Sequence, residues 1–116
     1  MHEMGIAMQV VEIATAAVPE GMAGSRVERV NLRVGKLSAV VPDSLRFCFD
    51  ILIRDTPLVN ASLNIQEVPV SARCGDCGHA WIAERPEFLC PRCGGGAVQL
   101  LSGQELEIVS IDIADV

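Results

Sequence analysis

Four of the five cysteines in this 116-residue chain form two C-x-x-C pairs separated by twelve residues, Cys74 with Cys77 and Cys90 with Cys93. The two-residue spacing lets both sulfurs of a pair reach one ion. Two pairs then supply four thiolates in the tetrahedral arrangement that suits Zn²⁺, at Zn–S distances of about 2.3 Å. Because four protein ligands leave no position for a water molecule, we expect a closed structural zinc site and not a catalytic one.

The remaining cysteine chemistry has blander explanations as well. Two disulfides, free thiols or iron in a rubredoxin-like site are the alternatives to zinc. The N-terminus has no basic segment and already carries Glu3, so we expect no secretory signal and a reducing, cytoplasmic setting in which paired cysteines favour metal. His79 directly follows the first pair and is a candidate accessory ligand, although a solvated neighbour is the commoner case. Cys48 is expected to be a small buried hydrophobe.

The N-terminal sequence Met-His-Glu offers a second metal site. His2 can chelate an ion through its imidazole, its own backbone nitrogen and the α-amine of Met1. Nitrogen donors of this kind in a square plane suit Ni(II) or Cu(II), and Glu3 adds a carboxylate and another amide nitrogen. The alternative is a frayed terminus without a role. The hypothesis from the residues alone is therefore a nickel site at His2.

Composition excludes several classes of function. The formal net charge is −6 and the pI is about 4.7, which argues against a protein that binds nucleic-acid phosphates. No window contains the roughly 20 consecutive apolar residues of a membrane span. The sequence shows no Ser/His/Asp set, no phosphate-binding glycine loop and no pair of catalytic carboxylates, so we do not expect an enzyme.

The elements that must position these residues follow from periodicity and breakers. Apolar residues at helical spacing predict a helix over Met4–Val18, packed on most of its circumference and ended by Pro19. Alternation predicts a strand over Val27–Gly35. Pro42 begins a second helix, with Leu45, Phe49 and Leu52 on its apolar face.

Two further strands are expected, at residues 63–68 and 105–115. Between Ser71 and Gly103 lie four of the cysteines and six of the ten glycines, which indicates an inserted module. The predicted class is α+β, with two helices on a small three-stranded sheet and an inserted zinc-ribbon-like module. The expected boundaries are a main domain of residues 1–69 and 104–116 and a zinc module of residues 70–103.

Four stretches together resemble one known family, the HypA/HybF nickel metallochaperones of hydrogenase maturation. They are MHE at the start, ERVNLRVGKLSAVVPDSLRFCFD, C-x-x-C-G-H followed by C-P-x-C, and GQELEIVSIDI near the end. The pieces are generic by themselves, but their combination in this order is specific. The resemblance covers nearly the whole chain.

The resemblance implies a non-enzymatic carrier of Ni(II). His2 would be the essential nickel ligand, with Met1 and Glu3 supplying amine or backbone nitrogens. Structural Zn(II) would be held by Cys74, Cys77, Cys90 and Cys93. The implied partners are a nickel-handling GTPase and the precursor of the large subunit of [NiFe] hydrogenase; some members also serve urease, and a homodimer is a candidate state. The alternative is an acidic zinc-ribbon adaptor that binds proteins and has no nickel role.

Overall fold

The computed structural model describes residues 2–22, 24–84 and 88–114 of the chain. The chain forms two compact units. The helical unit comprises Met1–Arg33, Ala39–Gln66 and Glu107–Val116, and the cysteine unit comprises Val34–Ser38 and Glu67–Leu106. In chain order the elements are α1 (Glu3–Ala17), β1 (Val27–Gly35), α2 (Pro42–Leu52), β2 (Ser62–Val68), β3 (Ser71–Cys74), β4 (Ala80–Ile82), β5 (Val98–Ser102) and β6 (Leu106–Ile113), with short 3-10 helices at Glu20–Met22 and Lys36–Ser38.

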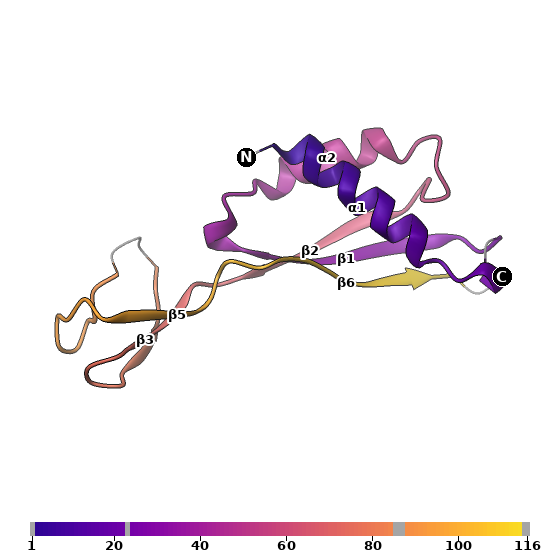
Figure 1. The fold of residues 1–116 in the computed structure, drawn as a ribbon. Coiled ribbons are helices and arrows are strands. Elements are labelled where there is room, and N and C mark those ends of the chain that lie inside the picture. The colour runs from indigo at the N-terminus through magenta and orange to yellow at the C-terminus, as the bar shows by residue number, and fades with distance from the viewer. Residues whose placement is uncertain (1, 23, 85–87, 115–116) are drawn as a thin grey trace. The chain divides into compact units, whose positions relative to one another are not determined.

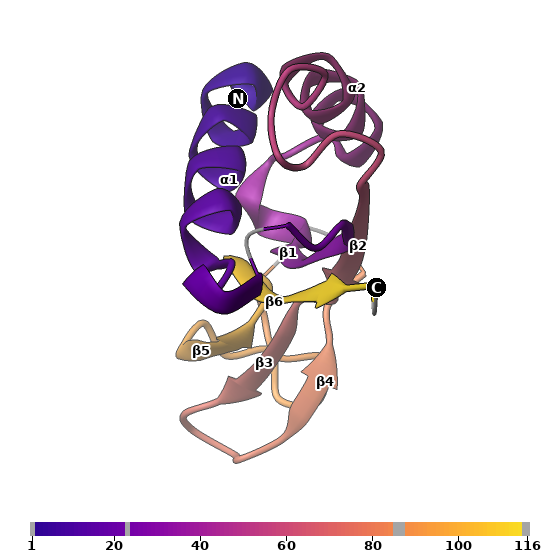
Figure 2. The same cartoon turned by 90° about the vertical axis from the view of Figure 1, so that its right-hand side faces the viewer.

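The helical unit is built on a three-stranded sheet in the order β2-β1-β6, so the last strand returns beside the first. Both helices lie over one face of this sheet (Figures 1 and 2). The predicted α+β class with two helices and small sheets is therefore confirmed. Neither helix is long and apolar enough to cross a membrane, since α1, the longer of the two among the described residues, has 15 residues.

The core of the helical unit lies between the central strand and the helices. Val30 and Leu32 of β1 are at most 2% exposed, and Leu45 and Phe49 of α2 are fully buried. The strand alternation and the i, i+4 spacing in α2 place these side chains on the facing surfaces. Burying each of them contributes about 1.5–3 kcal/mol relative to leaving it exposed. As predicted, α2 begins with Pro42, whose fixed φ suits the first helical turn.

The prediction that α1 is packed on most of its circumference is wrong. Only a narrow stripe of Ala7, Val10 and Ala14 is buried, whereas Met8 and Ile13 are 58% and 55% exposed. A helix that rests on one sheet face and one neighbouring helix is covered from one side only. The apolar pattern located the covered stripe but overstated its width.

The other face of the sheet is polar. Arg29 donates to Asp112 at 2.8 Å, Arg33 donates to Glu107 at 3.0 Å, and Asn31 donates to both Ser110 and Asp112 across the same pair of strands. The hydrogen bonds from Arg29 and Asn31 hold the pKa of Asp112 below its usual value. Because these pairs are solvent-exposed, they set the pairing of β1 with β6 more than they add stability.

The cysteine unit has its own antiparallel sheet in the order β4-β3-β5. Ala72 of the central strand β3 faces Trp81 of β4 and Leu100 of β5. Two glycines close the base of this unit: the N–H of Gly35 donates to the carbonyl oxygen of Glu105 at 2.7 Å, and the carbonyl oxygen of Gly103 accepts from Leu37 at 2.8 Å. A Cβ on Gly35 would collide with the carbonyl group of Gly103.

We predict that Gly35→Ala destabilises the protein by at least about 1–3 kcal/mol, because the added methyl group meets a backbone carbonyl that is held by a hydrogen bond. Gly5→Ala is the matched control, since nothing lies within 4 Å of a Cβ there and the site is helical; it should stabilise by about 0.5–1 kcal/mol. Denaturant unfolding at constant metal content measures both. Identical midpoints for the two variants would contradict the steric explanation.

Candidate metal centres

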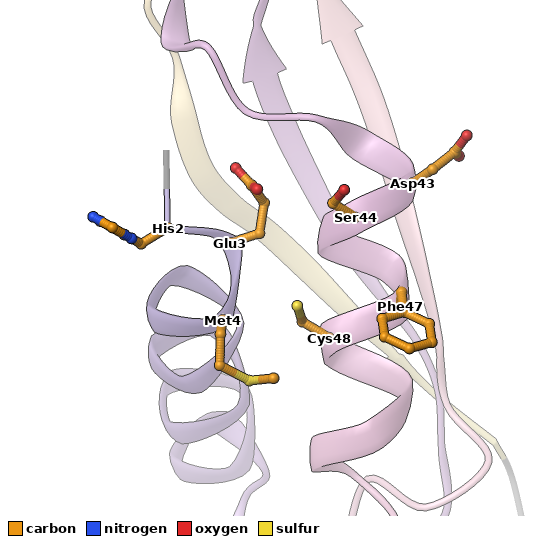
Figure 3. A pocket seen from close by; sticks show the side chains of 7 residues that line it. All are labelled: His2, Glu3, Met4, Asp43, Ser44, Phe47 and Cys48. Atoms are coloured by element: carbon orange, nitrogen blue, oxygen red, sulfur yellow. The ribbon is translucent and has the colours of Figure 1, made fainter.

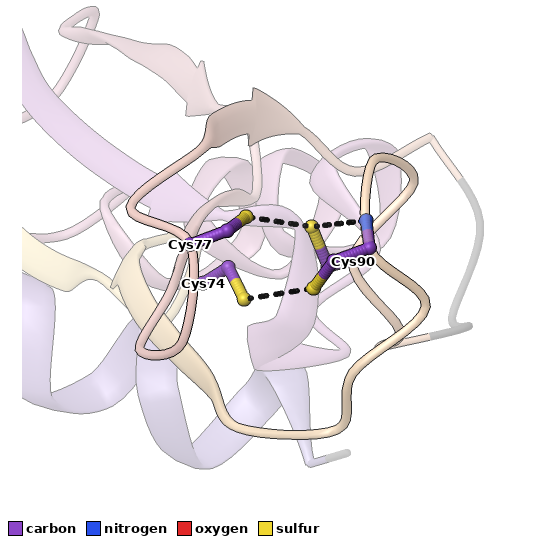
Figure 4. Close-up of side chains that lie close together, drawn as sticks. Cys74, Cys77 and Cys90 are labelled. Atoms are coloured by element: carbon purple, nitrogen blue, oxygen red, sulfur yellow. Dashed lines mark hydrogen bonds between the residues drawn. The ribbon is translucent and has the colours of Figure 1, made fainter.

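The four paired cysteines converge on one point in the cysteine unit. Their Sγ atoms all lie within 4.8 Å of one another, with Cys74 and Cys93 3.6 Å apart and Cys77 and Cys90 also 3.6 Å apart (Figure 4). Two sulfurs on a tetrahedral zinc ion are separated by roughly 3.8 Å when each Zn–S distance is about 2.3 Å. The observed separations therefore fit a single tetrahedral ion.

Both cysteine pairs are shaped by the same backbone turn. Gly78 has φ +77° and donates its N–H to the carbonyl oxygen of Cys74, while Gly94 has φ +74° and donates to the carbonyl oxygen of Cys90. Residues other than glycine rarely adopt this left-handed conformation. The glycines thus let each chain segment turn back after its second cysteine, so that all four thiols face inward.

The electrostatics of the cluster call for a cation. Desolvation raises the pKa of Cys90, but N–H groups of Cys93 and Arg92 donate to its Sγ and lower the pKa to about 7. The Gly95 N–H lowers the pKa of Cys93, yet hydrogen bonds with the neighbouring thiols Cys74 and Cys90 raise it to about 12. Protons therefore stay within the cluster because four thiolates repel one another. A divalent ion removes that repulsion and lets all four ionise.

His79 lies next to the cluster and supports it through its backbone. Its carbonyl oxygen accepts the N–H of Cys74 at 2.8 Å. Its imidazole stacks on Trp81, with ring centroids 5.8 Å apart and planes inclined by 14°. Among the described residues, the group of ligand atoms close enough to share an ion consists of the four cysteines.

The Met-His-Glu segment leads directly into α1. His2 is the N-cap residue; it is exposed and its side chain makes no capping hydrogen bond, while its carbonyl oxygen accepts from Ile6 at 3.2 Å. The N–H groups of the first helical turn have no acceptor within a helix, so the amide nitrogen of Glu3 is not required by α1. Met1, the third residue of the predicted chelate, lies outside the described residues.

A cavity of about 520 Å³ lies beside this terminus, within the helical unit. α1 and the residue before it contribute one wall and α2 the other; the lining residues are His2, Glu3, Met4, Asp43, Ser44, Phe47 and Cys48 (Figure 3). The Oε2 atom of Glu3 is shielded from solvent and has no hydrogen-bond partner among the described residues. A buried carboxylate oxygen is costly unless a proton or a cation satisfies it, so the cavity favours a positive ion.

The prediction that Cys48 is a buried core residue is wrong. Cys48 is half-buried and lines this cavity, one residue before the fully buried Phe49. On a helix a step of one residue turns the side chain by about 100°, which takes Cys48 off the Leu45/Phe49 stripe. The i, i+4 pair of Ser44 and Cys48, which runs parallel to that stripe, was the available signal.

Comparisons with known proteins agree over almost the whole chain. A sequence model of the family described as HypA, hydrogenase/urease nickel incorporation, metallochaperone, matches residues 1–113. The chain is 59% identical over 115 residues to a hydrogenase maturation factor HypA from Desulfosudis oleivorans, with 99% of this chain and 100% of that protein covered. It is 52% identical over 115 residues to the corresponding protein of Desulfatibacillum aliphaticivorans, with 99% and 88% covered.

Two solved structures share the fold. The solution structure of the Ni metallochaperone HypA from Helicobacter pylori superposes with a TM-score of 0.66, 22% sequence identity and 97% of each chain covered. A second solution structure of a HypA protein gives a TM-score of 0.70 at 22% identity, with 98% of this chain and 97% of that chain covered.

We predict that Cys90→Ser releases the metal of the cysteine unit and unfolds that unit, because a neutral hydroxyl replaces one of four thiolate ligands. Elemental analysis and the fluorescence of Trp81, the only tryptophan, report the two effects. Cys48→Ser is the matched control and should keep one metal ion per chain. Full metal content in Cys90→Ser would contradict the four-thiolate site.

The affinity of the cluster for zinc should rise with pH. Cys90, with a pKa of about 7, loses its proton first, whereas Cys93, with a pKa of about 12, gives up its proton only when metal binds. Each proton released on binding raises the apparent affinity about ten-fold per pH unit. Between pH 7 and 9 we therefore expect at least that slope in competition against a chelator of known pH dependence. A pH-independent affinity would show that protons do not compete with the metal.

Proposed function

The chain belongs to the HypA family of hydrogenase/urease nickel-incorporation metallochaperones, and from this membership we propose that it binds one Ni(II) at its N-terminus and delivers it for maturation of [NiFe] hydrogenase. The family consists of metallochaperones and not of enzymes. His2 binds the ion through its imidazole and backbone nitrogen. The amine of Met1 and the backbone nitrogen of Glu3 complete a square-planar set of nitrogen donors.

The placement of His2 supports this assignment most directly. Its side chain is not used to cap α1, and the amides that follow it precede the first intrahelical hydrogen bonds. The adjoining cavity carries the carboxylates of Glu3 and Asp43, which attract a divalent cation. The helical unit is held together by a core that includes Leu45 and Phe49, so nickel can leave without unfolding it.

The second metal has a different role in this proposal. Cys74, Cys77, Cys90 and Cys93 hold Zn(II) permanently, because four thiolates close the coordination sphere of the ion. We assign nickel binding to a domain of residues 1–69 and 104–116, and zinc binding to the module of residues 70–103.

Transfer requires partners, since the chain shows no glycine loop for binding a nucleotide phosphate. A nickel-handling GTPase would supply the energy, and the large-subunit precursor of the hydrogenase would receive the ion in the cytoplasm. The formal charge of −6 becomes about −8 once four thiolates and Zn²⁺ are counted, because +2 − 4 = −2. Such a surface suits a protein that collects cations and docks on other proteins.

The test compares the only two histidines of the chain in nickel titrations of the zinc-loaded protein. His2→Ala should weaken nickel binding by at least about 10–100-fold, since it removes the imidazole that closes the chelate. His79→Ala is the matched control and should bind nickel as the wild type does.

Blocking the α-amine provides an independent check, because it removes another nitrogen donor without changing a side chain. It should weaken nickel binding in the wild type. If neither His2→Ala nor the blocked amine changes the affinity or the spectrum of the nickel complex, the N-terminal site is wrong and the acidic zinc-ribbon adaptor becomes the better explanation.

A further inference from the structure

We propose that Cys48, on α2, is a sulfur ligand of the nickel cargo, a role that rests on the N-terminal nickel site proposed above. The ion is then held between two helices, with nitrogen donors at the start of α1 and a thiolate from the first half of α2. This makes Cys48 a functional residue and not a filler of the core.

The position of Cys48 supports this role. It is half-buried, lines the same cavity as His2 and Glu3, and is not bound in a disulfide. Its thiol points across the cavity toward the start of α1 (Figure 3). The other four cysteines form the separate cluster in the cysteine unit, so Cys48 is the one thiol available to an ion in the helical unit.

The cavity offers a mixed set of donors that suits nickel. The thiol of Cys48 and the thioether of Met4 face each other from the two walls, and the imidazole of His2 is reached from the same rim. Ni(II) is a borderline ion that accepts both nitrogen and sulfur donors. The unsatisfied Oε2 of Glu3 is an independent sign that a cation belongs here, because no described protein group pairs with it.

Binding changes the protonation of Cys48. The Ni–S bond forms as the S–H bond breaks, and the proton passes to solvent, with no change in the oxidation state of nickel. The thiolate also adds a negative charge near the ion. Handover then requires that one thiolate be protonated again or replaced by a donor of the acceptor protein.

The experiment adds nickel alone to zinc-loaded chain and follows absorption and affinity together. In the wild type, a thiolate-to-nickel charge-transfer band should grow in proportion to the nickel bound at His2. Cys48→Ser should lack the band and bind nickel about ten-fold more weakly, because the nitrogen donors remain. Ser44→Ala changes a neighbouring polar residue of the same cavity wall and should keep both the band and the affinity.

Alkylation gives a second measurement on the unmodified sequence. With zinc in the cluster, Cys48 is the thiol open to an alkylating reagent. Bound nickel should slow its modification by about ten-fold or more, because a coordinated sulfur is a poor nucleophile. The zinc content must stay at one ion per chain throughout, which excludes nickel bound in place of zinc.

The two proposals fail in different ways. If His2→Ala impairs nickel binding while Cys48→Ser keeps the wild-type affinity and spectrum, Cys48 is not a ligand and the N-terminal site stands. If His2→Ala binds nickel as the wild type does, the N-terminal function is wrong, and the inference about Cys48 falls with it. Alkylation of Cys48 at the same rate with and without bound nickel would also overturn the inference.

Discussion

The repulsion among four thiols that share one small volume governs the cysteine unit. That unit buries few apolar side chains: among its described residues, only Val34, Val68, Val70 and Ala72 are buried besides two of the cysteines. A unit of this size with so little core needs another source of stability. The ion that neutralises the thiolates provides it, and the glycine turns, the backbone hydrogen bonds to sulfur and the small sheet all serve to bring the sulfurs together.

The helical unit follows the opposite arrangement. Its stability comes from apolar contacts such as those of Leu32, Leu45 and Phe49, and the potential metal donors lie at its edge, where the first turn of α1 faces α2. Folding there does not depend on an ion. A protein that must keep one metal and surrender another can separate the two tasks in this way, with one ion built into the fold and the other bound at a preformed surface cavity.

Local sequence patterns predicted what local geometry decides. The cysteine spacing, the positive φ after each pair, the strand at Val27–Gly35 and the start of α2 at Pro42 all depend on neighbours in the chain. The position of Cys48 does not, because it depends on how α1 packs beside α2. The exposure of Met8 and Ile13 was missed for the same reason: periodicity identifies an apolar face but not how much of it another element covers.

The two ends of the β3–β5 segment are fastened to each other. Ser71 pairs with Ser102, and the hydroxyl of Ser102 donates to the carbonyl oxygen of Pro69 at 2.8 Å. A segment that leaves and re-enters the chain path at one place can differ in length or sequence without changing the distance that the rest of the chain must span. The metal-bearing segment is thus topologically an exchangeable cartridge, and its evolution can proceed with little constraint from the sheet formed by β2, β1 and β6.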